Sequence, residues 1–156
     1  MADDQEVERA KAACLRLLAH RARSEAELRE RLRRRGVEEQ VAAQAVADLS
    51  AAGLVNDREF AESWIRERRE LHATGRVGLR WELRRKGVPE EIIQTALGGL
   101  DDEEELELAL GYARKKLGDQ PAAGPKELAR LRRALISRGF GGDIIQIVIE
   151  RLSAEL

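Results

Sequence analysis

Apolar residues recur along the chain at the spacing expected for one face of an α-helix. The clearest stretch lies near the C-terminal end, where an i, i+1, i+4, i+5, i+8 pattern is formed by Ile144, Ile145, Val148, Ile149 and Leu152. Elsewhere the chain is rich in Ala, Leu, Glu and Arg, which favour helices, and it lacks alternating β-branched runs between turns. The pattern predicts an all-α fold.

The helical pattern occurs three times. Gly36, Gly87 and Gly139 lie 51 and 52 residues apart, with leucines eight and four positions before each and an apolar residue directly after each. Further apolar residues stand five, ten and thirteen positions after each glycine, which predicts a second amphipathic helix. These later positions are Val41, Ile92 and Ile144, then Val46, Leu97 and Ile149, then Leu49, Leu100 and Leu152. We predict that each glycine ends a helix in the left-handed conformation.

Another amphipathic helix precedes each of these pairs, at about residues 6–20, 57–71 and 102–117. Ser24 and Glu27 have the spacing of a capping box, and Asn56 with Glu59 resembles one. Pro89 suits the first turn of a helix. The sequence therefore predicts three tandem three-helix repeats, residues 1–55, 56–100 and 101–156. Because a repeat of this size buries little core alone, we expect the repeats to pack into an elongated or curved array.

Charge is sorted among these helices, although the 28 Lys and Arg nearly cancel the 29 Asp and Glu. Residues 24–35 carry five cations and three anions, residues 72–88 carry five and one, and residues 119–139 carry five and two. The helix after each glycine has a net negative charge instead. Repetition of the basic helices predicts a basic stripe for phosphates or an acidic partner, although cations near a helix C-terminus also complement its dipole.

Several classes of function lack the residues that they need. No apolar run approaches the roughly 18 residues of a membrane span, and the acidic N-terminus has no signal-peptide pattern, so we expect a soluble, cytoplasmic protein with no membrane partner. Cys14 cannot form an internal disulfide, and with His20 and His72 it makes a zinc site only if carboxylates complete it. Phosphate-loop, serine-hydrolase, zinc-protease and dinucleotide motifs are absent from the sequence. We therefore expect no enzyme activity, no metal and no other cofactor.

Several of these segments resemble the RecX family. The D-x-x-F-A element of that family is similar to residues 56–61. Its R element is similar to Arg68, which follows the apolar Trp64 and Ile65, and its E-L-x-x-K-G-[IV] element is similar to residues 82–88. Residues 24–32 resemble its first repeat and residues 135–145 its third, whereas residues 73–76 depart from its usual shorter basic turn. The resemblance implies three tandem three-helix repeats and a regulator that binds the RecA filament on single-stranded DNA, most often inhibiting its ATPase and strand exchange.

The candidate mechanism is occupancy of a filament groove by the basic stripe, which would contact DNA phosphates or acidic protein surface. The strongest cluster is Arg84, Arg85 and Lys86. Trp81 lies two residues from Leu79 and from Leu83, so we expect it to face away from the core, toward a neighbouring repeat or a base. The full set of candidate contacts is Arg33, Arg34, Arg35, Arg76, Arg80, Trp81, Arg84, Arg85, Lys86, Arg132, Arg133 and Arg138.

The family pattern also includes Asp57, Phe60 and Glu82, which we interpret as a helix-start residue, a core residue and a packing residue. The expected partners are the RecA filament and single-stranded DNA, reached directly or through the filament, and we expect a monomer. Two alternatives stay open. Residues 24–54 also suit a helix-turn-helix transcription regulator, and the net charge of −1 suits a helical scaffold that binds no nucleic acid.

Overall fold

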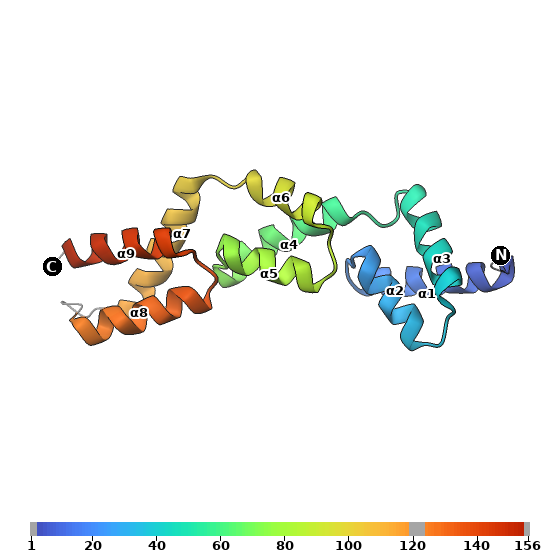
Figure 1. Cartoon of the computed structure of the whole chain (residues 1–156), viewed down its shortest axis with the longest axis horizontal. Coiled ribbons are helices and arrows are strands. Elements are labelled where there is room, and N and C mark those ends of the chain that lie inside the picture. The colour runs from blue at the N-terminus through green and yellow to red at the C-terminus, as the bar shows by residue number, and fades with distance from the viewer. Residues whose placement is uncertain (1–2, 119–123, 155–156) are drawn as a thin grey trace. The chain divides into compact units, whose positions relative to one another are not determined.

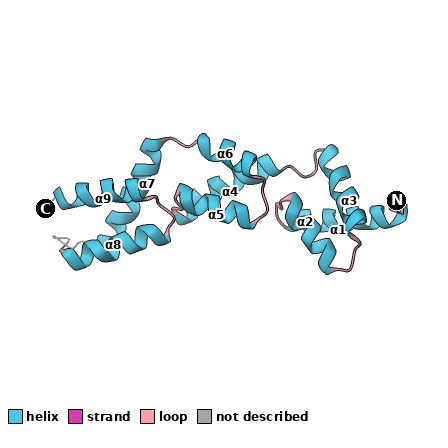
Figure 2. Ribbon diagram, in the orientation of Figure 1, coloured by secondary structure: helices cyan, strands magenta, loops and turns pink. Residues whose placement is uncertain are grey.

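The computed structural model describes residues 3–118 and 124–154, and all regular structure within these ranges is helical, as Figure 2 shows. The helices group in threes along the chain (Figure 1). Their bounds are α1 Asp4–His20, α2 Glu25–Arg34, α3 Glu39–Ala51, α4 Asp57–His72, α5 Arg76–Arg85, α6 Glu90–Gly98, α7 Asp102–Leu117, α8 Pro125–Ser137 and α9 Gly142–Ala154. The predicted all-α fold of three three-helix repeats is therefore confirmed.

The middle helix of each repeat ends in the same way. Gly36, Gly87 and Gly139 have φ angles of 85°, 77° and 85°, as predicted from their spacing. The residue after each glycine donates its N–H to the carbonyl five positions back, as Val37 does to Leu32 at 3.0 Å. This Schellman arrangement satisfies carbonyls that the end of a helix would otherwise leave without partners.

The predicted capping box at Ser24 is also present. The Ser24 hydroxyl accepts the Glu27 N–H at 3.1 Å, and the Glu27 carboxylate accepts the Ser24 N–H at 3.1 Å. Asn56 accepts the N–H groups of Arg58 and Glu59 at 2.9 and 3.2 Å, so it caps α4 as its similarity to a capping box suggested.

Pro89 differs slightly from its predicted place. Helix α6 begins at Glu90, so Pro89 directly precedes the helix instead of lying in its first turn. The Pro89 carbonyl accepts the N–H groups of Ile92 and Ile93 at 3.0 and 3.1 Å. Proline suits this place because it has no N–H that would need an acceptor.

The chain divides into two compact units, one of residues 1–63 with 83–93 and the other of residues 64–82 with 94–156. We call them unit 1 and unit 2. Each unit combines one terminal repeat with helix ends from the middle repeat. The repeat borders at residues 1–55, 56–100 and 101–156 stay a prediction, because the units are formed across the second repeat.

In unit 1, α1 and α2 both pack against α3. The leucines predicted from the repeat, Leu28 and Leu32, are fully buried together with Cys14. Burial raises the pKa of the Cys14 thiol, so this cysteine is a small apolar core residue.

In unit 2, α7, α8 and α9 pack against one another around Leu135 and Val148. The depth of burial differs between neighbouring positions of the predicted pattern. In α6 and α9, Ile93 and Ile145, six positions after the glycine, are buried, whereas Ile92 and Ile144 at plus five are half-buried. In repeat 1, by contrast, the plus-five residue Val41 is itself buried.

Among the described residues, no helix is long and apolar enough to cross a membrane. Nor does any group of three or more potential metal-ligating side chains gather there. His20 and His72 are the last residues of α1 and α4, the helix-end positions that the sequence indicated.

The three glycines differ in their surroundings, and this difference generates a prediction. A methyl group at Gly36 would meet no atom within 4 Å, whereas one at Gly87 would overlap the side chain of Ala26. Gly36→Ala should cost about 1 kcal/mol of unfolding free energy, since only the left-handed backbone opposes it. Gly87→Ala should cost about 2 kcal/mol or more, because packing strain adds to the backbone strain. Urea denaturation of the two variants measures both costs, and equal costs would contradict the close approach of Gly87 to Ala26.

Candidate partner and nucleic-acid interface

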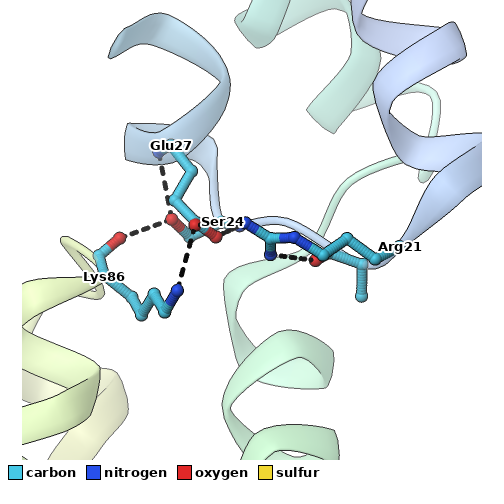
Figure 3. Close-up of polar contacts among 5 residues, drawn as sticks. Arg21, Ser24, Glu27 and Lys86 are labelled. Atoms are coloured by element: carbon cyan, nitrogen blue, oxygen red, sulfur yellow. Dashed lines mark hydrogen bonds and ion pairs between the residues drawn. The ribbon is translucent and has the colours of Figure 1, made fainter. Parts of the chain in front are cut away.

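The start of α2 lies against the end of α5 in unit 1 (Figure 3). The Ser24 hydroxyl donates to the Lys86 carbonyl at 2.5 Å, while the Lys86 ammonium lies 3.4 Å from the Glu27 carboxylate. The N–H of Glu25 donates to the Asp57 carboxylate at 2.9 Å. The positive end of one helix dipole thus meets the negative end of another, and orphan groups of both helices gain partners. We call this arrangement the first junction.

The pKa values of two carboxylates in the first junction are shifted in opposite directions. Burial raises the pKa of Asp57, although the Glu25 N–H opposes this effect. Burial also acts to raise the pKa of Glu27, but the hydrogen bonds from Arg21 and from the Ser24 N–H, together with the charge of Lys86, outweigh it and lower that pKa. Asp57 is therefore a helix-start residue that also caps α2, in agreement with its structural interpretation.

Unit 2 contains an equivalent arrangement, the second junction. The N–H groups of Gly75 and Gly78 donate to the carbonyls of Arg138 and Gly139 at 2.9 and 3.1 Å, so the start of α5 lies against the end of α8. A carboxylate again comes from the first helix of the following repeat, since Glu105 of α7 accepts the Arg76 N–H at 2.8 Å. A Cβ at Gly75 would overlap the backbone of Gly139, so this close approach requires glycine.

Glu105 also forms a nearly buried ion pair with Arg69, whose nitrogen lies 2.5 Å from its carboxylate. The side chains are only 2% and 12% exposed. Residues 101–105 form an acidic run at the start of α7, where Asp101 caps the helix by accepting the Glu103 N–H at 3.1 Å. The acidic run therefore serves the fold of unit 2.

Three of the predicted contact cations have structural roles in the junctions. Lys86 belongs to the first junction, as described above. Arg76 donates to the Asp102 carboxylate at 2.6 Å and to the Leu100 carbonyl at 2.5 Å. Arg138 donates to the His72 carbonyl at 2.7 Å, and its guanidinium lies 5.0 Å from the centre of the Tyr112 ring. These side chains hold helix ends together, a role that sequence reasoning did not assign to them.

A second group of predicted cations forms ion pairs with carboxylates nearby in the sequence, within one helix or between consecutive helices. Arg33 and Arg34 lie 2.8 and 3.2 Å from Glu30, and Arg84 lies 2.9 Å from Glu90. All three arginine side chains are more than half exposed, and such surface pairs contribute little to stability. Their guanidinium groups therefore stay accessible to a partner.

The remaining residues of the predicted contact set are exposed or half-buried. Arg35, Arg132 and Arg133 are exposed, and their side chains form no hydrogen bond or ion pair with another described residue. Arg85 is exposed and Arg80 is half-buried. Trp81 is 60% exposed, so it faces away from the repeat core as predicted.

Sequence reasoning missed part of the surface beside the first junction. A pocket of about 460 Å³ there is lined by six basic and two acidic side chains, together with two small residues. Its lining consists of Arg21, Arg23, Ala26, Glu27, Glu30, Arg31, Arg34, Arg85, Lys86 and Gly87. Arg21 and Arg23 precede the capping box, so a charge count that starts at residue 24 leaves them out. We call this cavity the junction pocket.

Comparison with known proteins agrees with this architecture. Three family models, described as the first, second and third three-helix domains of RecX, match residues 10–49, 56–97 and 102–149. The chain belongs to the RecX family. A protein named Regulatory protein RecX from Amycolatopsis mediterranei (strain U-32) is 38% identical over 157 residues, covering 97% of this chain and 90% of that protein. One of the same name from Mycobacterium sp. (strain KMS) is 39% identical over 154 residues, covering 95% and 84%.

Solved RecX structures show the same fold. The crystal structure of RecX from Lactobacillus salivarius has a TM-score of 0.85 at 23% identity and covers 96% of this chain and 98% of its own. A second crystal structure, of regulatory protein RecX, has a TM-score of 0.79 at 23% identity and covers 93% and 72%.

The departure of residues 73–76 from the RecX pattern falls in the second junction. Ala73 has a φ of 49°, Thr74 is buried, and Gly75 and Arg76 supply junction hydrogen bonds. In this chain the segment therefore packs helix ends together.

The buried ion pair of the second junction provides a test of its importance. Glu105→Gln should lower the unfolding free energy by about 3 kcal/mol, since it leaves the Arg69 charge nearly buried and without its carboxylate. Glu104→Gln, at an exposed neighbour in the same first turn, should change it by less than about 0.5 kcal/mol. Denaturant unfolding measures both values. Similar small losses in the two variants would show that the pair does not stabilise unit 2.

Proposed function

We propose that this protein regulates homologous recombination and DNA repair by binding the RecA filament on single-stranded DNA and inhibiting its ATP turnover and strand exchange. The observation that carries the proposal is the match to all three RecX domains in order. The relatives at 38% and 39% identity are named regulatory proteins.

The distribution of charge supports the proposal physically. A chain with a net charge of −1 can still bind an anionic filament if its cations are gathered on particular surfaces. The accessible arginines of α2, α5 and α8 belong to helices with a positive net charge. Binding by these groups needs no covalent step: the bound protein blocks incoming duplex or restrains the subunit movements that accompany ATP turnover.

The helix-turn-helix alternative finds less support. A recognition helix enters the major groove and needs cations nearby to contact the flanking phosphates. In the first repeat that helix would be α3, which contains no Lys or Arg and carries Glu39 and Asp48. Its charge would repel DNA.

A filament-binding experiment tests the proposed function. RecA filaments locked with a non-hydrolysable nucleotide on single-stranded DNA should retain this protein in a pull-down, and added protein should slow RecA ATP hydrolysis in a titration. Duplex DNA without RecA should retain less. Absence of both filament retention and ATPase inhibition would contradict the proposal, whereas tight, site-selective duplex binding would favour a transcription regulator.

The structure selects Arg132 and Arg133 as a test of the basic surface, because they make no hydrogen bonds or ion pairs with other described residues. Arg132→Gln/Arg133→Gln should weaken filament binding and reduce the slope of log affinity against log salt by about one unit per lost phosphate contact. The unfolding free energy should stay within about 0.5 kcal/mol of the parent.

The matched control is Arg9→Gln/Arg16→Gln, which removes the same charge from exposed positions of α1. It should keep the parental salt slope. If both double variants lose the same affinity, net charge alone governs binding, and a role for the basic face of α8 is wrong.

A further inference from the structure

We propose that the junction pocket is a phosphate-binding site that accepts the sugar-phosphate backbone of single-stranded DNA or the phosphates of a free nucleotide. This inference rests on the proposed function, since it names the part of the surface that would meet nucleic acid. The first observation behind it is the lining, in which six basic side chains surround two acidic ones in about 460 Å³.

The two carboxylates of the pocket are already engaged. Glu27 accepts hydrogen bonds from Arg21 at 3.0 Å and from the Ser24 N–H at 3.1 Å, and it also pairs with Lys86. Glu30 pairs with Arg33 and Arg34. Neither carboxylate forms a hydrogen bond or ion pair with Arg23 or Arg31.

Arg23 and Arg31 therefore bring positive charge to the pocket that no hydrogen bond or ion pair with a described carboxylate neutralises. The Nε atom of Arg23 is buried and has no hydrogen-bond partner among the described residues, and Arg31 forms no hydrogen bond or ion pair within them. Burial lowers the pKa of Arg23, and the charges of Arg21 and Arg31 lower it further, while the charge of Glu27 only partly offsets them. Arginine nevertheless stays protonated at neutral pH, so these like charges repel one another until an anion binds.

Comparison of the two junctions shows that helix packing does not require these arginines. Counting 51 residues along the repeat, Arg23 corresponds to Thr74 and Arg31 corresponds to Glu82. Thr74 is buried, and Glu82 pairs with Arg68 at 2.9 Å. The second junction thus joins the equivalent helix ends, the start of α5 and the end of α8, without these two cations. The repulsion at the first junction brings no packing advantage, which points to a ligand.

The chemistry of the lining favours phosphate. Guanidinium groups present paired N–H donors that match phosphate oxygens, and several of them can share one phosphate. The volume lies within the roughly 300–1,000 Å³ typical of small-ligand sites, so the pocket can hold a nucleotide-sized segment. A neutral or cationic ligand would leave the repulsion between Arg23 and its neighbours in place.

The test uses the full chain without RecA, so that it can fail independently of the proposed function. The probes are a fluorescent oligothymidylate and inorganic pyrophosphate, measured by anisotropy and calorimetry. Arg23→Gln/Arg31→Gln should weaken oligothymidylate binding about tenfold or more, the loss expected for charge-assisted hydrogen bonds. The control Arg9→Gln/Arg16→Gln should bind within about twofold of the parent.

Thermal unfolding supplies a second readout. Because the pocket variant removes repulsion and no described hydrogen bond, its melting temperature should equal or exceed that of the parent. If the double variant fails to fold, Arg31→Gln alone serves as the test, since this side chain is only half-buried. Loss of binding to both probes identifies a general phosphate site, and loss of oligothymidylate binding alone identifies the DNA backbone as the source.

The inference would be overturned if the pocket variant and the control bound the probes equally. It would also be overturned if a folded pocket variant had a lower melting temperature than the parent and unchanged probe binding. A parallel RecA ATPase titration separates the two hypotheses. Suppose that the parent inhibits the ATPase, and that a folded pocket variant inhibits it and binds the probes as well as the parent does. The pocket inference then fails, while the proposed function stands. If the parent leaves the ATPase unchanged, the proposed function fails and the probe measurements still decide the pocket.

Discussion

Both compact units depend on the satisfaction of helix ends by other helices. The first N–H groups and last carbonyls of any α-helix have no partners within that helix. In unit 1 the Ser24 hydroxyl at the start of α2 satisfies the Lys86 carbonyl, and in unit 2 the N–H groups of Gly75 and Gly78 satisfy carbonyls at the end of α8. Each contact brings the positive end of one helix dipole next to the negative end of another.

This constraint accounts for several residue choices at once. The glycine that ends each middle helix adopts a positive φ. At Gly87 and Gly139 the start of the preceding repeat's middle helix approaches this glycine closely. At the first junction a serine side chain bridges the helix ends, while at the second junction bare glycine backbones meet directly. A carboxylate from the first helix of the following repeat, Asp57 of α4 or Glu105 of α7, caps the start of the middle helix in both cases.

The local features of the fold were predictable from the sequence because they depend on residues within one or two helix turns. The three-fold repeat, the left-handed glycines and the Ser24 capping box are all of this kind. The partners of the helix ends were not predictable, since Ser24 and Lys86 are 62 residues apart and no periodicity relates them.

The same limit explains the outcome for the candidate site. From the sequence, a cation at a helix end suits both a partner contact and an internal one, and the structure assigns Arg76, Lys86 and Arg138 to internal contacts. Arg23 and Arg31 join the candidate surface only through the pocket beside the first junction. The exposed Arg132 and Arg133 were identified from charge alone, because a solvated helix face needs no tertiary partner.

Native-state hydrogen exchange measures whether helix ends of successive repeats are joined by hydrogen bonds. The amides of Glu25, Gly75 and Gly78 lie at helix starts and have no acceptor within their own helices, so any protection reports the junctions. The account predicts that these three amides exchange as slowly as interior amides of α2 and α5. Exchange at the rate of an unprotected surface amide would contradict it.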